Sequence, residues 1–207
     1  MSNGTKAKYL TLFIIFNFVT YFGIQLLFTV NEYNFLTSLD HVIPFVPEFV
    51  WIYHTLIPVI LITMFSFVSR KEVFFSAFTA YMIASVTLSI FYVLFPSFYP
   101  RESFVDPSSI SGWLVELTRM IDGANNTFPS GHVTFSWLLA FFVGLTQYVK
   151  NRPWIKTVYF VWAVLITLST LTLKQHFIVD VLSGILLASM CYFLSKNIIF
   201  KRLQTAN

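Results

Sequence analysis

The chain has 207 residues, of which 57% are hydrophobic and only 11% are charged, and its formal net charge is +4. Soluble domains carry about a quarter charged residues, so this composition excludes an ordinary water-exposed surface. The mean hydropathy of +0.73 and the 25 phenylalanines indicate an integral membrane protein. The positive charge does not indicate nucleic-acid binding, because the basic residues form short clusters between apolar runs and no basic stripe.

Six apolar runs approach the roughly 20 residues that a helix needs to cross a bilayer. They lack the alternating pattern of a transmembrane barrel. The sequence therefore predicts an all-α, polytopic membrane protein, with one domain over residues 1–207 built as a six-helix bundle. The predicted spans are Tyr9–Val30, Val50–Ser69, Val73–Phe95, His132–Val149, Trp154–Leu173 and Phe177–Leu194. Pro58 is expected to kink the second span, which membrane helices tolerate.

The first apolar run has a second interpretation, as a cleaved signal peptide that begins with Lys6 and Lys8. Its apolar stretch is longer than a usual signal core, and no small-residue cleavage site follows it. An uncleaved transmembrane helix is therefore the favoured interpretation.

Basic residues gather on the side of the predicted bundle that holds the N-terminus. Ten of the thirteen Lys and Arg residues lie there, and the other three are Arg101, Arg119 and Lys174. Of the acidic residues, Glu72 alone falls on the basic side. The positive-inside rule therefore predicts that both termini are cytoplasmic and that the long loops are external. The short remaining loops favour a prokaryotic plasma or inner membrane.

The second external loop contains one segment with a helical pattern, Gly112–Asp122. Trp113, Leu117 and Met120 recur at helical spacing, with charged residues between them. We expect a short helix that either lies in the membrane interface or caps the bundle.

The run Pro129–His132 has the composition of an anion-binding helix start. Ser130 is a good helix N-cap, and Gly131 allows close backbone approach. Free amides at a helix N-terminus attract anions. His132 at this place could donate a proton to a leaving oxygen. Taken alone, the run also fits an ordinary capped helix with an incidental histidine.

A second polar run precedes the last predicted helix and contains Lys174, His176 and Asp180. His176 and Asp180 are four residues apart and share a helix face. A carboxylate on one imidazole nitrogen fixes the tautomer and makes the other nitrogen more nucleophilic. A buried His–Asp pair with a purely structural role is the alternative.

Together the two runs and Arg101 provide a phosphate cradle, a proton donor, an oriented nucleophile and two cations on one membrane face. This set meets the needs of phosphoryl transfer through a phosphohistidine. Three alternatives are less favoured. A zinc site would need a tighter ligand motif than His54, His132, His176 and Asp180 provide. A transporter would spread ionisable residues through the bilayer depth and show repeated halves. An adaptor without chemistry leaves the cluster unexplained.

These runs resemble motifs of the type 2 phosphatidic acid phosphatase superfamily. Pro129–His132 is similar to its central motif, and the His-x-x-x-Asp run His176–Asp180 is similar to its last motif. The resemblance extends over roughly residues 100–184, and the six-helix layout fits the whole chain. It implies a lipid phosphate phosphatase, with a lipid or amphiphilic phosphate as substrate.

The resemblance also implies a role for each residue. His176 would be the nucleophile, and Asp180 would orient it. His132 would be the general acid and later the base. Ser130 and the amide of Gly131 would hold phosphate oxygens. No metal ion or other cofactor would be required.

Three departures from the family pattern point to an alternative function. Arg101 matches the arginine of the first motif, but Leu94 stands where that motif has lysine, and no proline follows Arg101. Ser169-Thr170 replaces Ser-Arg of the last motif, so that Lys174 is expected to supply the charge. Lipid head-group phosphotransferases related to inositol phosphorylceramide and sphingomyelin synthases depart similarly, and Asp40–Pro47 resembles a run in that branch. Head-group transfer with the same histidines is therefore the alternative.

Overall fold

The computed structural model describes residues 1–27, 32–101, 105–200 and 202, and this part of the chain is helical without a strand. The long helices are α1 (Asn3–Leu27), α4 (Lys71–Leu94), α8 (Trp154–Thr172) and α9 (Ile178–Ser195). The shorter α-helices are α2 (Val50–Tyr53), α3 (Leu56–Ile62), α5 (Ile110–Ile121), α6 (Gly131–Val143) and α7 (Gln147–Lys150). Short 3-10 turns are η1 (Asp40–Val42) and η2 (Pro47–Phe49), and π-helical turns are η3 (Thr63–Phe67) and η4 (Lys196–Phe200).

Five helical segments are long and apolar enough to cross a membrane, which confirms the predicted all-α membrane fold. They are Asn3–Leu27, Pro47–Phe67, Lys71–Leu94, Trp154–Thr172 and Ile178–Phe200. The predicted end of the first span, at residues 28–30, lies outside the described residues. The first helix starts at Asn3, six residues before the predicted Tyr9.

The fourth predicted span, His132–Val149, is not confirmed at its full length. Helix α6 has 13 residues, about 20 Å at 1.5 Å per residue, against about 30 Å for the bilayer core. The chain turns at Gly144, and Thr146 caps the next turn by accepting from the amide of Val149. This hydroxyl also donates to the carbonyl of Val143 at 2.8 Å. The apolar run therefore continues past the point where the helix ends.

The second predicted span, Val50–Ser69, is interrupted. Helix α2 ends at Tyr53 and α3 begins at Leu56. Pro58 has no N–H for the carbonyl of His54, four residues earlier, and its ring crowds that carbonyl. The proline was expected to kink this helix, and the structure shows a break in the helix about one turn before Pro58.

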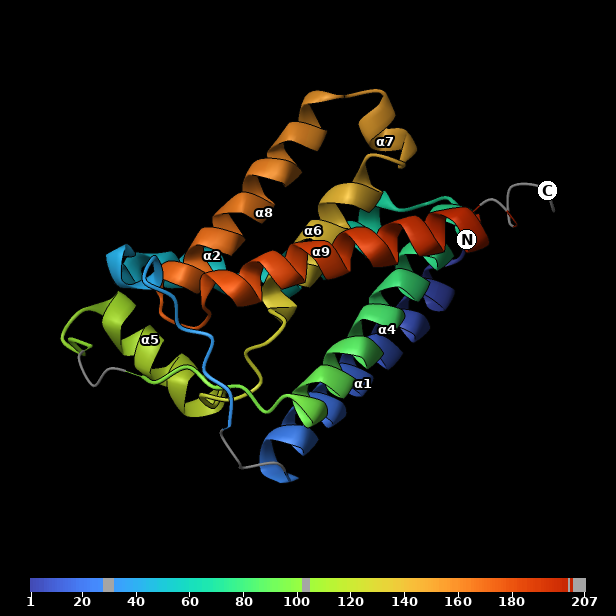
Figure 1. The fold of residues 1–207 in the computed structure, drawn as a ribbon. Coiled ribbons are helices and arrows are strands. Elements are labelled where there is room, and N and C mark those ends of the chain that lie inside the picture. The colour runs from blue at the N-terminus through green and yellow to red at the C-terminus, as the bar shows by residue number, and fades with distance from the viewer. Residues whose placement is uncertain (28–31, 102–104, 201, 203–207) are drawn as a thin grey trace.

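Helix α6 lies at the centre of the bundle, where it packs against α4, α8 and α9 (Figure 1). Helix α1 runs along α4 on one side of the bundle. Small residues allow the close packing of α4, because Ala77, Ala80 and Ala84 are fully buried on its inner face.

Different helix ends meet at the two ends of the bundle. The starts of α1 and α4 and the end of α9 lie together, because Tyr9 contacts Phe75 edge to face and Ser76 bonds Ser195 at 2.9 Å. Helices α2 and α5 lie at the opposite end (Figure 1). Helix α5 matches the short helix predicted at Gly112–Asp122. Its Met120 side chain is 81% exposed, and its place relative to a membrane surface stays a prediction.

Candidate active site

The start of α6 is joined directly to the start of α9. Ser130 caps α6 by accepting from the amide of Val133, and its own amide donates to the carbonyl of Asp180 at 3.0 Å. One turn later, the hydroxyl of Thr134 donates to the carbonyl of Gly184 at 3.2 Å. A Cβ atom on Gly184 would lie 2.8 Å from the carbonyl oxygen of Ser130. Glycine is needed here because the two helix starts approach so closely.

His176 lies in the turn between α8 and α9 and is only 7% exposed. Its Nδ1 atom is 2.9 Å from the carbonyl oxygen of Thr127 and 3.5 Å from Oδ2 of Asp180. A carbonyl can only accept, so Nδ1 carries the proton and Nε2 keeps a free lone pair. The same Oδ2 accepts from the amide of Phe177 at 2.9 Å. Asp180 therefore caps α9 and faces the imidazole at once.

The structure brings the second predicted histidine to the first. The ring centroids of His132 and His176 are 6.3 Å apart. The ring of Tyr53 stacks on His132 with a centroid distance of 4.1 Å and an interplanar angle of 25°. Because His132 is the second residue of α6, it lies next to the first-turn amides, which have no partner within a helix. The arrangement places two imidazoles beside a potential anion site.

Arg101 is engaged with the backbone around the end of α5. Its guanidinium donates to the carbonyls of Arg119 at 2.9 Å, Gly123 at 2.6 Å and Asp122. It also donates to Oε1 of Gln175 at 3.1 Å, next to His176. Burial lowers the pKa of Arg101, and the negative charge of Asp122 acts in the opposite direction. The guanidinium remains charged and ties the α5 end to the His176 turn.

Lys174 is engaged with the first external loop. Its ammonium donates to the carbonyl of Ile43 at 2.6 Å and to that of Asp40 at 3.1 Å. Asp40 in turn accepts from the amide of Ile178 at 2.8 Å, at the start of α9. The backbone of Lys174 is left-handed, with φ of 56°. The loop thus braces the turn that carries His176, a role that the sequence did not indicate.

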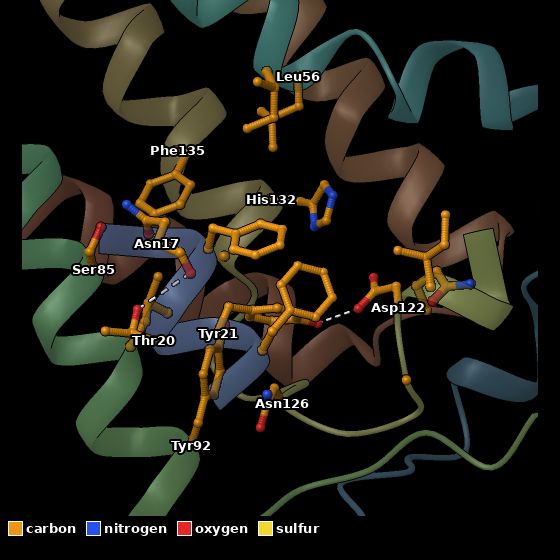
Figure 2. Close-up of a pocket in the computed structure, with 18 of the residues that line it drawn as sticks. Asn17, Thr20, Tyr21, Leu56, Ser85, Tyr92, Asp122, Asn126, His132 and Phe135 are labelled. Atoms are coloured by element: carbon orange, nitrogen blue, oxygen red, sulfur yellow. Dashed lines mark hydrogen bonds between the residues drawn. The ribbon is translucent and has the colours of Figure 1, made fainter. Parts of the chain in front are cut away.

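A pocket of about 440 Å³ opens next to the histidines. Both imidazoles line it. Figure 2 shows His132 there together with the side chains of Asn17, Asp122 and Asn126. The rest of its wall is mainly apolar and comes from α1, α3 and α4. These apolar residues include Phe13, Ile14, Phe18, Phe22, Leu56, Ile57, Ile60, Leu61 and Leu88. Among its described lining residues, none is Lys or Arg.

Sequence reasoning missed a polar cluster in this pocket. The Tyr53 hydroxyl donates to Oδ2 of Asp122 at 3.1 Å, and the Tyr21 hydroxyl donates to Oδ1 (Figure 2). Asp122 had only the signal of an acidic residue close to the central motif. The two tyrosines stand in apolar runs without a motif, so that only the fold brings them there.

In the described part of the chain, no group of three or more His, Cys, Asp or Glu side chains occurs that could hold a metal ion. His54 bonds Thr118 instead, with Nε2 2.8 Å from its hydroxyl oxygen.

Comparisons with known proteins agree with this architecture. Residues 10–194 match the PAP2 superfamily. A stretch of 73 residues is 37% identical to an uncharacterized protein of Methanocaldococcus jannaschii, and it covers 35% of this chain and 28% of that protein. The fold is similar to the crystal structure of Aquifex aeolicus LpxE, with a TM-score of 0.51 and 20% identity over 91% of this chain and 94% of that one. At this identity the likeness establishes a shared fold.

Proposed function

Because the chain belongs to the PAP2 superfamily, we propose that it is an integral membrane phosphatase that hydrolyses a lipid-linked phosphate monoester or diphosphate through a phosphohistidine. One observation carries the proposal. Nδ1 of His176 faces a carbonyl oxygen at 2.9 Å, which leaves Nε2 as a nucleophile, and His132 lies 6.3 Å away between ring centroids.

The first chemical step forms the phosphoenzyme. Nε2 of His176 attacks phosphorus, a P–N bond forms, and the P–O bond to the leaving group breaks. His132 donates its proton to the leaving oxygen. The imidazole of His176 becomes cationic in this step, and the carboxylate of Asp180, 3.5 Å from Nδ1, stabilises that charge.

The second step returns the enzyme to its starting state. His132, now neutral, takes a proton from water, whose oxygen attacks phosphorus and breaks the P–N bond. Inorganic phosphate leaves, His176 is neutral again, and His132 has regained its proton. In both steps the hydroxyl of Ser130 and the amide of Gly131 stabilise the phosphate oxygens.

Arg101 and Lys174 remain in the proposal as cations of the site. Both donate to protein oxygens in this structure, and direct contact with phosphate requires that either side chain exchanges one of these partners. Without such an exchange, both act through the turn that carries His176.

The apolar part of the pocket supports a lipid substrate. Its wall on α1 and α3 includes Phe18 and Ile57, which are 63% and 48% exposed. These side chains are on the outer surface of an apolar bundle, so that a hydrocarbon chain can enter from the bilayer. The phosphate end then reaches the histidines.

Head-group transfer to a second lipid is the other candidate. It is favoured by the burial of His176, which is only 7% exposed, because a transferase must protect its phosphoenzyme from water.

We further propose that both termini are cytoplasmic and the site is external, since Lys6 and Arg70 lie at the helix ends remote from it.

The test is phosphate release by the purified protein in detergent with chelator present. The panel contains phosphatidic acid, phosphatidylglycerophosphate, a polyprenyl diphosphate and a sphingoid phosphate. Release that survives chelation and is lost in His176→Ala supports the proposal. Release that is unchanged in this variant contradicts it. No release, followed by activity once a diacylglycerol or ceramide acceptor is added, supports transfer.

A further inference from the structure

Tyr53 makes the closest ring contact that the structure gives to His132. The two rings are nearly parallel, with centroids 4.1 Å apart. Tyr53 is the last residue of α2 and is only 4% exposed. A stacked ring at this distance restricts the imidazole to one orientation.

The position of Tyr53 is itself fixed. Its hydroxyl donates to Oδ2 of Asp122 at 3.1 Å, and the other carboxylate oxygen accepts from Tyr21 on α1. Arg101 holds the backbone carbonyl of Asp122. Two helices thus converge on the carboxylate of Asp122 while Arg101 holds its backbone, and that carboxylate holds the ring that covers His132.

The stack also acts on the charge of His132. A cation over the face of a tyrosine ring is attracted by the ring quadrupole, and more strongly when both are removed from water. A phenol that donates to a carboxylate is polarised toward the phenolate, which makes its ring face more negative. The protonated imidazole is therefore the form that Tyr53 stabilises.

We propose that Tyr53, held by Asp122, is the positioning residue that orients the His132 imidazole toward the leaving oxygen and stabilises the protonated form from which His132 donates. The inference rests on the proposed function and deepens it. Tyr53 transfers no proton itself. The proton that reaches the leaving oxygen comes from His132, which recovers it from water in the second step.

Other titratable groups surround the His132 stack, and each belongs to a different element. His54, directly after α2, is bonded to Thr118 on α5. The hydroxyl of Tyr92 on α4 donates to the carbonyl of Pro129 at 3.2 Å. The remaining groups are Tyr21 on α1, Asp122 after α5, His176 before α9 and Asp180 on α9.

The experiment exploits the leaving group. An alkyl oxygen needs a proton when the P–O bond breaks, whereas 4-nitrophenolate does not. We compare kcat/KM for a long-chain alkyl phosphate and for 4-nitrophenyl phosphate in wild type, Tyr53→Leu and Tyr53→Phe. Tyr81→Leu is the matched control, because Tyr81 is an equally buried tyrosine (3% exposed) whose hydroxyl bonds a carbonyl and which does not line the pocket.

Tyr53→Leu is expected to lower kcat/KM for the alkyl ester about tenfold and to leave the aryl ester nearly unchanged. In a plot of kcat/KM against pH for the alkyl ester, the fall in activity at high pH should begin at a lower pH in this variant than in wild type. Tyr53→Phe keeps the stack and should restore most of the alkyl activity. Tyr81→Leu should change both esters by the same factor.

If Tyr53→Leu lowers kcat/KM equally for both esters, or if its fall in activity at high pH stays where it is in wild type, the inference about Tyr53 is wrong while the proposed function still stands. An inactive wild type would overturn the proposed function and this inference with it.

Discussion

The carbonyl oxygen of Thr127 lies 2.9 Å from Nδ1 of His176, closer than the carboxylate of Asp180 at 3.5 Å. A backbone carbonyl cannot donate, so this contact alone specifies the tautomer in which Nε2 is free. The loop before the central motif therefore orients His176, the proposed nucleophile. Asp180 caps α9, and in the proposed mechanism it also stabilises the positive charge of His176.

Asp180→Asn should therefore reduce activity only moderately. We expect a loss between about tenfold and 1000-fold, below the roughly 10⁴-fold loss seen where a carboxylate alone fixes the tautomer. His176→Ala should abolish phosphate release. The measurement is kcat on the best substrate of the lipid panel. An Asp180→Asn variant as inactive as His176→Ala would show that Thr127 does not hold the tautomer.

The rate should depend on pH with a bell shape. His176 must be neutral to attack, so activity falls at low pH, and His132 must be protonated to donate, so it falls at high pH. The measurement is kcat/KM between pH 5 and 9 with an alkyl ester. In His132→Ala the alkaline limb should disappear. A flat wild-type profile would count against two-histidine catalysis.

Gly184→Ala should destabilise the fold near the site. The new methyl would lie 2.8 Å from the carbonyl of Ser130, and such overpacking costs about 1–3 kcal/mol. Gly23→Ala is the control, because a Cβ there meets nothing within 4 Å and alanine favours the helix. Thermal unfolding in detergent should show a lower Tm for the first variant only. Equal Tm values would mean that the two helix starts separate easily.

The apolar wall on α3 offers a test of lipid entry. Ile57→Trp should fill the pocket beside the histidines and raise KM for a long-chain phosphate about tenfold, while KM for 4-nitrophenyl phosphate changes little. Ile62→Trp is the matched control on the same helix, since Ile62 is 58% exposed and does not line the pocket. If the two variants have the same KM values on both substrates, the hydrocarbon chain of the lipid does not enter the pocket past Ile57.

Much of the architecture could be predicted from composition and hydropathy. The membrane fold, the family and the short helix near Gly112–Asp122 are confirmed. The fourth span, His132–Val149, is not confirmed at its full length, because hydropathy cannot detect the turn at Gly144 within an apolar run. The π-helical end of the second span, Thr63–Phe67, has no sequence signal either. Membrane sidedness stays a prediction.

The site was predictable where a motif gives the spacing. His132, His176 and Asp180 are brought together, while their chemical roles and those of Ser130 and Gly131 stay predictions. The supporting contacts depend on tertiary structure. Thr127 acts through its backbone, which no side-chain pattern reports.

The two halves of the pocket come from different parts of the bundle. The histidines are carried by the α6 and α9 starts, which are locked together by the Ser130–Asp180 bond of 3.0 Å. The apolar wall is carried by α1 and α3, which hold no residue of the two motifs. Under the proposed function, mutations of the apolar lining residues of α1 and α3 can therefore accumulate without disturbing bond cleavage. Descendants of such a chain can diverge in the lipid they accept while inheriting the same reaction.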